Sequence, residues 1–195
     1  MRTAEIQRST AETSIYLQIN LDGTGKADIQ TGIGFFDHML TLLARHSLVD
    51  LKVVAKGDLE VDFHHTVEDT GIVLGQAIRK ALGDKVGIRR YGWCYLPMDE
   101  TLARVVVDLS GRPFLEFRCA KDPGPVGSAF AFSLVEEFFR AFAFNLGANV
   151  HTDVLYGRDS HHIAEALFKG LAKCLMQAVE VDSRISGVLS TKELL

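Results

Sequence analysis

The stretches "DFHHTVED" (residues 62–69) and "SHHIAEAL" (residues 160–167) carry one pattern twice. In each, two adjacent histidines precede a glutamate by four and three residues. The copies lie about half a chain length apart, and they take four of the seven histidines in the sequence. A repeat of this kind bears on both the fold and the chemistry of the protein.

The two halves of the chain follow the same predicted order of elements, which is strands, helix, strand, and a helix opened by His-His-x-x-Glu. "AIRKAL" (77–82) and "CLMQAV" (174–179) match further downstream. Chance similarity between two amphipathic helices is the alternative, and the shared histidine pattern favours duplication. We therefore predict one α+β domain over residues 1–195, built of two repeats at about 1–90 and 91–195. Each repeat is a small, mostly antiparallel sheet with two helices on one face.

Apolar periodicity gives the expected elements of each half. Helical spacing predicts helices at about residues 35–46, 66–83, 131–147 and 161–181. Strand patterns occur at residues 14–21, 48–57 and 149–157, and two more flank the turn Ser110-Gly111 within 101–120. "DGTGKADI" (22–29) indicates a hairpin turn into a second short strand, and "KDPGPVGS" (121–128) indicates a linker.

Composition limits the classes of partner. The formal charge of −4 and pI near 6.0 argue against a general nucleic-acid or anionic-membrane partner. The three cysteines are scattered and do not form a CxxC pair, which is typical of reduced thiols. No apolar run approaches the roughly 20 residues of a membrane span. We expect a soluble cytoplasmic protein.

The repeated pattern suits metal binding. On a helix, positions i, i+3 and i+4 share a face, so Glu68 lies near His64 and His65, and Glu165 near His161 and His162. Adjacent histidines diverge by about 100° and do not easily bind one ion. The simplest arrangement has two divalent ions, to each of which each helix offers one imidazole. These donors suit Mn, Fe, Ni, Zn or Co without selecting one.

A lone helical histidine is more often a packed or surface residue, but two copies in a duplicated context favour a metal site. His38 in "FFDHML" and His151 in "NVHTDV" are then candidates to complete the coordination. The residues alone do not assign either of them to a particular ion.

Several basic residues are candidates for binding an anion. Arg112 follows a tight turn, and Lys169 lies one helical turn beyond Glu165. Arginine binds phosphate through two parallel hydrogen bonds, and Ser190 or Thr191 could add hydroxyl donors. Taken singly, these residues and Arg89, Arg90 and Lys192 are typical of a solvated surface. Neither GxGxxG nor GxxxxGK[ST] occurs, so no nucleotide loop is predicted.

A family resemblance covers essentially the whole chain. It is carried, in order, by "RSTAETSI", "TGIGFFDHML", "DFHHTVEDTGI", "GIRRYG", "PMDE", "DLSGRP", "SHHIAEALFKGLAKCL" and "STK". Together these segments resemble the imidazoleglycerol-phosphate dehydratase family of histidine biosynthesis, in its stand-alone form.

The resemblance implies a 24-mer of identical subunits, with two manganese ions per active site held between subunits. The implied metal ligands are His38, His64, His65, Glu68, His151, His161, His162 and Glu165. The implied phosphate pocket comprises Arg90, Arg112, Lys169, Ser190 and Lys192, with Arg90 chosen over Arg89 from motif position alone. Glu12 matches the acid/base carboxylate of the family, and His46 is expected close to the substrate.

Two positions depart from the family pattern. Leu42 stands where many members have a polar residue, and the ending "STKELL" lacks the glycine that usually follows the lysine.

The implied reaction removes water from D-erythro-imidazole-glycerol phosphate to give imidazole acetol phosphate. Our hypothesis is that the ring bridges both ions as an imidazolate and expels the C3 hydroxyl, which gives a diazafulvene-like intermediate. Glu12 is our candidate for the proton transfer at C2, after which the enol tautomerises.

Two other functions remain open from the residues alone. One is a dinuclear metallohydrolase acting on a phosphorylated small molecule, although such sites usually rely on aspartate bridges. The other is a non-enzymatic metal-binding or assembly protein, which leaves the arginine, lysine and serine set unexplained.

Overall fold

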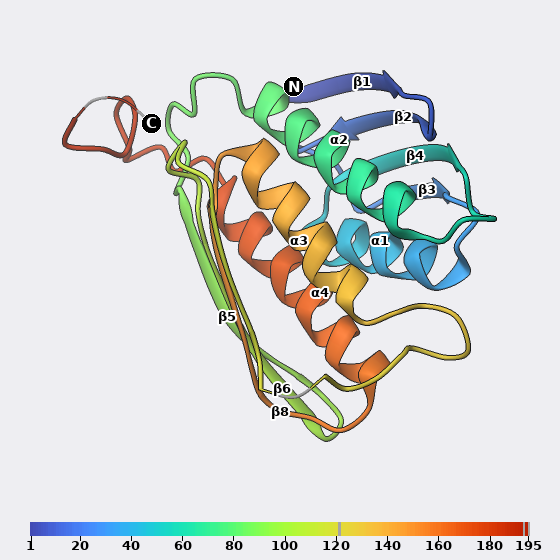
Figure 1. Ribbon diagram of the computed structural model, residues 1–195. Helices are drawn as coiled ribbons and strands as arrows, with labels where there is room; N and C mark the ends of the chain where they lie inside the picture. The colour runs from blue at the N-terminus through green and yellow to red at the C-terminus, as the bar shows by residue number, and fades with distance from the viewer. Residues whose placement is uncertain (121, 193, 195) are drawn as a thin grey trace.

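Within the residues that the structure describes, each half of the chain contributes four strands and two helices (Figure 1). The computed structural model describes residues 1–120, 122–192 and 194. The first half comprises β1 (Thr3–Ser9), β2 (Thr13–Asn20), β3 (Ala27–Gln30), α1 (Gly34–Ser47), β4 (Asp50–Gly57) and α2 (His64–Leu82). The second comprises β5 (Tyr91–Met98), β6 (Thr101–Asp108), β7 (Phe114–Cys119), α3 (Ser133–Leu146), β8 (Asn149–Tyr156) and α4 (Ser160–Ala178).

The two sheets have the same topology. Their strand orders are β1-β2-β4-β3 and β5-β6-β8-β7. In each sheet the third strand of the half runs parallel to the fourth, and the other two pairings are antiparallel. The predicted duplication of a mostly antiparallel α+β unit is therefore confirmed.

All four helices lie between the two sheets (Figure 1). Helices α1 and α2 cover one face of the first sheet, and α3 and α4 cover one face of the second. The halves meet through their helices, because α1 packs on α4 and α2 packs on α3. None of the described helices is long and apolar enough to cross a membrane.

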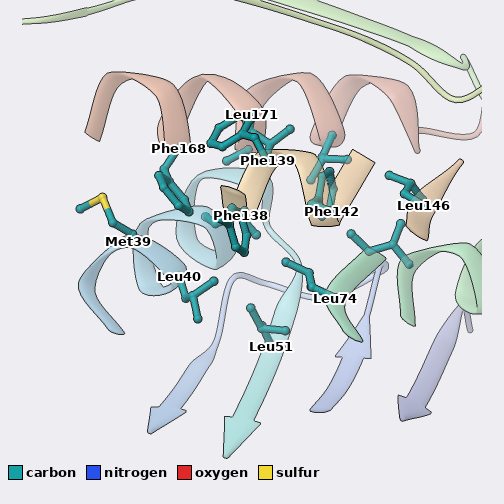
Figure 2. Packing of buried hydrophobic residues seen from close by; sticks show 14 of the residues in the cluster. Met39, Leu40, Leu51, Leu74, Phe138, Phe139, Phe142, Leu146, Phe168 and Leu171 are labelled. Carbon is teal, nitrogen blue, oxygen red and sulfur yellow. The ribbon is translucent and has the colours of Figure 1, made fainter. Parts of the chain in front are cut away.

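The core lies where these layers meet, and aromatic rings fill its centre (Figure 2). Phe138 of α3 stacks on Phe168 of α4 at 4.9 Å between ring centroids, and meets Phe36 of α1 edge-on at 5.5 Å. Such aromatic pairs add about 0.5–1.5 kcal/mol beyond the area they bury. Three helices from both halves are thereby joined at one point.

Helices α2 and α3 approach closely because α2 presents glycine at two positions one turn apart. A Cβ at Gly71 would lie 2.8 Å from the Phe138 carbonyl oxygen, and one at Gly75 would lie 2.6 Å from that of Phe142. Only glycine fits these distances without a shift of the backbone. This contact fixes α2, which carries the first histidine pair.

Three sequence expectations differ from the structure. The short strand expected after the turn is present as β3, but it pairs with β4 alone, so residues 22–26 do not form a hairpin turn. Strands β1 and β5 were not predicted. In β5, Gly92 and Pro97 interrupt the strand pattern, and its aromatic side chains are exposed. Helix α2 begins at His64 rather than near Thr66.

The predicted linker and the chain end are only partly described. Residues 122–128 contain no helix or named strand, and Val126 forms an isolated bridge with Phe130. Lys121 of that linker and positions 193 and 195 of the ending "STKELL" lie outside the described residues.

Candidate metal centre and active site

Both histidine pairs lie in the first turn of a helix whose backbone is held by a preceding aspartate. Asp159 caps α4 by accepting hydrogen bonds from the backbone N–H groups of His161 and His162, at 2.8 and 3.2 Å. Asp62 accepts in the same way from the His64 N–H at 2.7 Å. An aspartate at this position satisfies free N–H groups of the first turn and so fixes its geometry.

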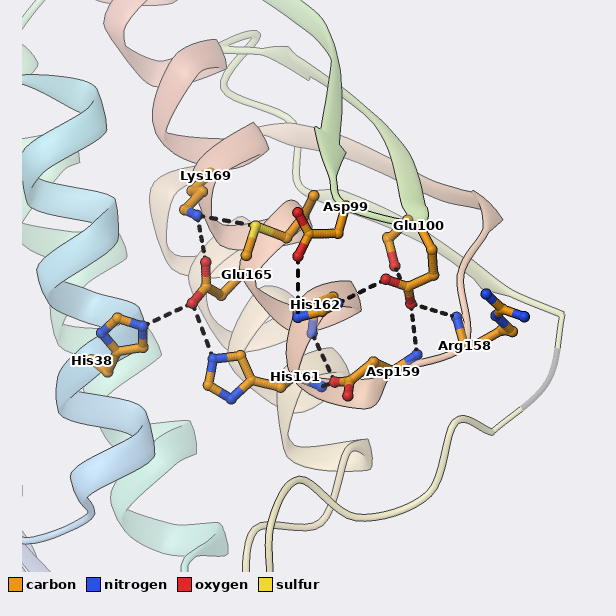
Figure 3. Close-up of polar contacts among 11 residues, drawn as sticks. His38, Asp99, Glu100, Arg158, Asp159, His161, His162, Glu165 and Lys169 are labelled. Carbon is orange, nitrogen blue, oxygen red and sulfur yellow. Dashed lines mark hydrogen bonds and ion pairs between the residues drawn. The ribbon is translucent and has the colours of Figure 1, made fainter.

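The second pattern and α1 bring three potential metal ligands together (Figure 3). His38 Nε2 lies 2.9 Å, and His161 Nε2 lies 3.0 Å, from Glu165 Oε1. One ligand atom from each of these residues falls within 4.8 Å of the others, and no other trio of such side chains in the described part of the chain does so. Two imidazoles and a carboxylate fit a divalent ion such as Mn²⁺, Fe²⁺ or Zn²⁺.

Glu165 is buried and surrounded by nitrogen donors. Burial raises its pKa, but hydrogen bonds from Lys169, His38 and His161 outweigh that effect and lower the pKa to about 2. Lys169 Nζ donates to the second carboxylate oxygen (Figure 3). The carboxylate is thus held ionised, which is the form that binds a divalent ion.

The second histidine of each pair forms a hydrogen bond through Nδ1 with a carboxylate. His65 Nδ1 lies 3.0 Å from Asp58 Oδ2, and His162 Nδ1 lies 2.7 Å from Glu100 Oε2. These hydrogen bonds raise the pKa of each imidazole, Asp58 acting on His65 and Glu100 on His162. Each Nε2 is left available, in the arrangement that orients metal-binding histidines in many proteins.

A hairpin turn in each half places a further carboxylate near that Nε2. Glu12, between β1 and β2, has Oε1 3.8 Å from His65 Nε2. Asp99, between β5 and β6, has Oδ2 3.7 Å from His162 Nε2. Of these carboxylates the sequence motifs point to Glu12 but not to Asp99, Glu100 or Asp58. The repeated dipeptide Glu-Thr at 12–13 and 100–101 was a signal for the second hairpin.

The first histidine pattern forms a looser group than the second. His64 Nε2 lies 3.7 Å from Glu68 Oε2, and both side chains are exposed. His65 and Glu12 form a separate pair beside them, with the His64 and His65 ring centroids 6.1 Å apart.

His151 stands apart from both histidine pairs. It lies on β8, where its neighbours Val150 and Thr152 are buried against the helices, so His151 projects from the opposite, outer face of the second sheet. The Phe114 ring lies 5.7 Å from its ring. This outer face also exposes Tyr91, Trp93 and Tyr95 of β5.

Four of the five predicted phosphate ligands line one cavity of about 800 Å³. They are Arg90, Arg112, Ser190 and Lys192. Arg89 instead forms ion pairs with Glu180 and Asp182 and does not line this cavity. The geometry therefore favours Arg90 over Arg89.

This cavity and the metal cluster lie at opposite ends of α4. The Arg90 N–H donates to the carbonyl of Ala178 at the end of α4, whereas His161 and Glu165 are in its first two turns. A helix of this length extends over roughly 27 Å at 1.5 Å per residue. Lys169, the fifth candidate, bonds to Glu165 and thus belongs to the metal cluster.

His46 lies on α1, two turns beyond His38. Its pKa is lowered, first by burial and then by the charges of Lys173 and Lys169. Leu42, on the same helix, is partly buried against the core.

The sequence motifs and this geometry agree with a known family. A family model described as imidazoleglycerol-phosphate dehydratase matches residues 31–175. The chain belongs to the imidazoleglycerol-phosphate dehydratase family. It is accordingly a dehydratase, a carbon–oxygen lyase.

Similar proteins extend the match to the chain ends. Imidazoleglycerol-phosphate dehydratase of Azorhizobium caulinodans is 62% identical over 98% of each chain, and that of Akkermansia muciniphila is 60% identical over 100% of each. The crystal structure of the Staphylococcus aureus dehydratase has a TM-score of 0.82 at 41% identity, covering 92% of this chain and 99% of that one. The structure from Pyrococcus furiosus, in complex with (S)-C348, has a TM-score of 0.84 at 37% identity, covering 97% and 100%.

Proposed function

We propose that this dehydratase converts D-erythro-imidazole-glycerol phosphate to imidazole acetol phosphate in histidine biosynthesis, and that it depends on two divalent cations per site, preferably Mn²⁺. Full-length identity near 60% to proteins named for this substrate supports the reaction. The metal requirement depends on one observation, the convergence of His38, His161 and Glu165 from two helices.

Eight residues are proposed to hold the two ions. The contacts support His38, His161 and Glu165 as ligands of one ion. His64, His65, Glu68, His151 and His162 supply the remaining donors. When bound, divalent cations at this centre supply Lewis acidity, which favours loss of the N–H proton from an imidazole ring.

The protein's own groups then move the proton and bind the phosphate. Glu12 is half exposed beside His65 and is proposed to transfer the proton at C2 of the substrate. Asp58 and Glu100 orient His65 and His162 through Nδ1. Arg90, Arg112, Ser190 and Lys192 provide a cavity with charged and hydroxyl donors for the phosphate. Lys169 lies beside Glu165 at the other end of α4 and is proposed to meet a phosphate held by the cavity of a neighbouring subunit.

The separation of these groups within one chain supports an active site shared between subunits. His151 on the outer face of the second sheet and the basic cavity at the far end of α4 do not meet the His38 cluster in the same chain. We therefore propose a homo-oligomer, a 24-mer by family resemblance, in which neighbours complete each site. A cytoplasmic location is part of the proposal, supported by the scattered cysteines of the sequence.

The test is to purify the full chain with Mn²⁺, measure its native mass, and follow formation of imidazole acetol phosphate before and after chelation. Turnover that is lost with EDTA and restored by Mn²⁺, in an assembly far above 21.5 kDa, is the expected result. A metal-free monomer with full turnover would contradict both parts of the proposal.

The same preparation tests the two alternatives. A dinuclear hydrolase would release inorganic phosphate from p-nitrophenyl phosphate or from the substrate itself. A protein with purely structural ions would lose its assembly on chelation and have no dehydration to lose. We expect neither.

A further inference from the structure

We propose that Asp108 is a positioning residue for the basic cavity. It holds the Arg90 guanidinium in one orientation. In that orientation the guanidinium binds the C-terminal segment at Leu189 and has two N–H groups left to donate to an anion. This inference rests on the proposed function, in that the anion is taken to be the phosphate of the substrate.

The contacts of Arg90 account for three of its five donors. Arg90 Nε donates to Asp108 Oδ1 at 2.6 Å, and Nη2 donates to Asp108 Oδ2 at 3.0 Å. Nη1 donates to the Leu189 carbonyl at 2.8 Å. A guanidinium has five N–H groups, so one remains on each terminal nitrogen. Free guanidinium donors of this kind suit the oxygens of a phosphate.

The surroundings place Arg90 at the cavity. Arg112, Ser190 and Lys192 line the same space, and the side chain of Arg90 is only 11% exposed. Since Ser190 directly follows Leu189, the bond from Nη1 to the Leu189 carbonyl also sets where Ser190 and Lys192 stand. One carboxylate thereby orders donors from two distant parts of the chain.

The backbone at Arg90 gives an independent reason to assign a role to the side chain. Its φ is +68°, in the left-handed region that glycine adopts without strain. Hydrogen bonds hold this conformation, from the Arg90 N–H to the Ala178 carbonyl and from the Leu109 N–H to the Arg90 carbonyl. An arginine in this backbone conformation carries a conformational cost. That cost is consistent with a functional requirement for the arginine side chain at this position.

The first half of the chain contains a matched control. Arg2 binds Asp22 through Nε at 3.0 Å and Nη2 at 2.6 Å, and its Nη1 donates to the Val179 carbonyl. This bonding copies that of Arg90, but neither Arg2 nor Asp22 lines the basic cavity. The variant D22N therefore removes an equivalent carboxylate charge away from the cavity.

The test compares D108N with D22N in the assembled, Mn²⁺-loaded protein. Asparagine keeps the volume of aspartate but has only one acceptor oxygen. Its NH2 group would point a donor at the donors of the guanidinium. We expect D108N to raise KM for imidazoleglycerol phosphate, and the inhibition constant of inorganic phosphate, by about tenfold or more. The value of kcat should stay within about threefold, because Asp108 does not approach the metal cluster. Amide hydrogen exchange over residues 186–192 should become faster.

The opposite results would overturn the inference. These are an unchanged KM in D108N, or equal losses in D108N and D22N, which would indicate general destabilisation. If D108N does not assemble, D108E serves instead, because it keeps the charge but displaces the guanidinium. An intermediate rise in KM supports the role, and a wild-type KM refutes it.

The proposed function can fail separately. If the wild-type protein does not dehydrate the substrate, amide hydrogen exchange still tests whether Asp108 orders the C-terminal segment. The rates over residues 186–192 are then compared between D108N and D22N. Equal rates in the two variants would then reject the positioning role.

Discussion

At the scale of single residues, the second histidine of each pair shows how the fold orients a proposed metal ligand. A carboxylate behind Nδ1 fixes the ring, and Nε2 faces a carboxylate on a hairpin turn. The two halves repeat this arrangement with different residues, Asp58 in one and Glu100 in the other. What the duplication has kept is the orientation of the imidazole.

Glu12 is the residue whose removal should affect the chemistry most selectively. E12Q keeps the size of the side chain but cannot take up a proton, so we expect kcat to fall by about 10²–10⁴-fold. Manganese content and substrate affinity should be unchanged. Steady-state kinetics measures kcat and KM, and elemental analysis measures the manganese content. E60Q, at an exposed loop position, is the control. Near-normal turnover in E12Q would remove Glu12 from the mechanism.

Asp58 should act on metal affinity. In D58A the His65 ring loses the hydrogen bond to Nδ1, and loss of such a partner typically weakens metal binding by about 10–100-fold. Calorimetric titration of the metal-free protein with Mn²⁺ measures this change. D28A removes an exposed aspartate paired with Lys52 and should bind as the wild type does. Equal affinities in D58A and D28A would show that the contact does not orient a ligand.

The limit of sequence reasoning is visible at the residues of the site. The pattern identified both pairs and their glutamates because helical spacing is local. Asp58 and Glu100 were missed because each meets its histidine through the fold, Glu100 from 62 positions away. The grouping of His38 with Glu165, 127 positions apart, likewise depends on the packing of α1 on α4.

At the scale of elements, the close contact of α2 with α3 positions the first histidine pair. In G75A the new Cβ would meet the Phe142 carbonyl at 2.6 Å. We expect a loss of about 1–3 kcal/mol from overpacking, which exceeds the gain of roughly 0.5–1 kcal/mol from helix propensity. Urea unfolding followed by circular dichroism measures the difference. G34A is the control, since nothing lies within 4 Å of its Cβ, and its midpoint should not fall. A midpoint for G75A at or above that of the wild type would contradict this account.

The elements themselves were predicted unevenly. Helix α1 was expected at 35–46 and spans Gly34–Ser47, since its apolar spacing is regular. Strand β5 was missed because aromatic side chains on its outer face hide the alternation expected of a half-buried strand. The parallel pairing of β3 with β4 was also missed, since a strand followed by a glycine-containing turn and a second short strand resembles a hairpin.

At the scale of the whole molecule, the separation of His151 from the His38 cluster predicts complementation between variants. H151A and H161A each lack one proposed ligand, and we expect both to be inactive alone. If ligands from neighbouring chains form one site, mixed assemblies contain some sites with both histidines intact. Dissociating the two variants, mixing them and reassembling them with Mn²⁺ should then restore part of the turnover. Mixed assemblies verified by native mass spectrometry that stay inactive would contradict shared sites.

The outer face of the second sheet also contains a built-in optical reporter. Trp93, the one tryptophan of the sequence, is 64% exposed there between Tyr91 and Tyr95. Indole emission shifts to shorter wavelength, and quenching by acrylamide weakens, when a ring leaves water. If a neighbouring subunit covers this face as proposed, the intrinsic fluorescence of the unlabelled protein therefore reports assembly in real time on dilution or metal loading.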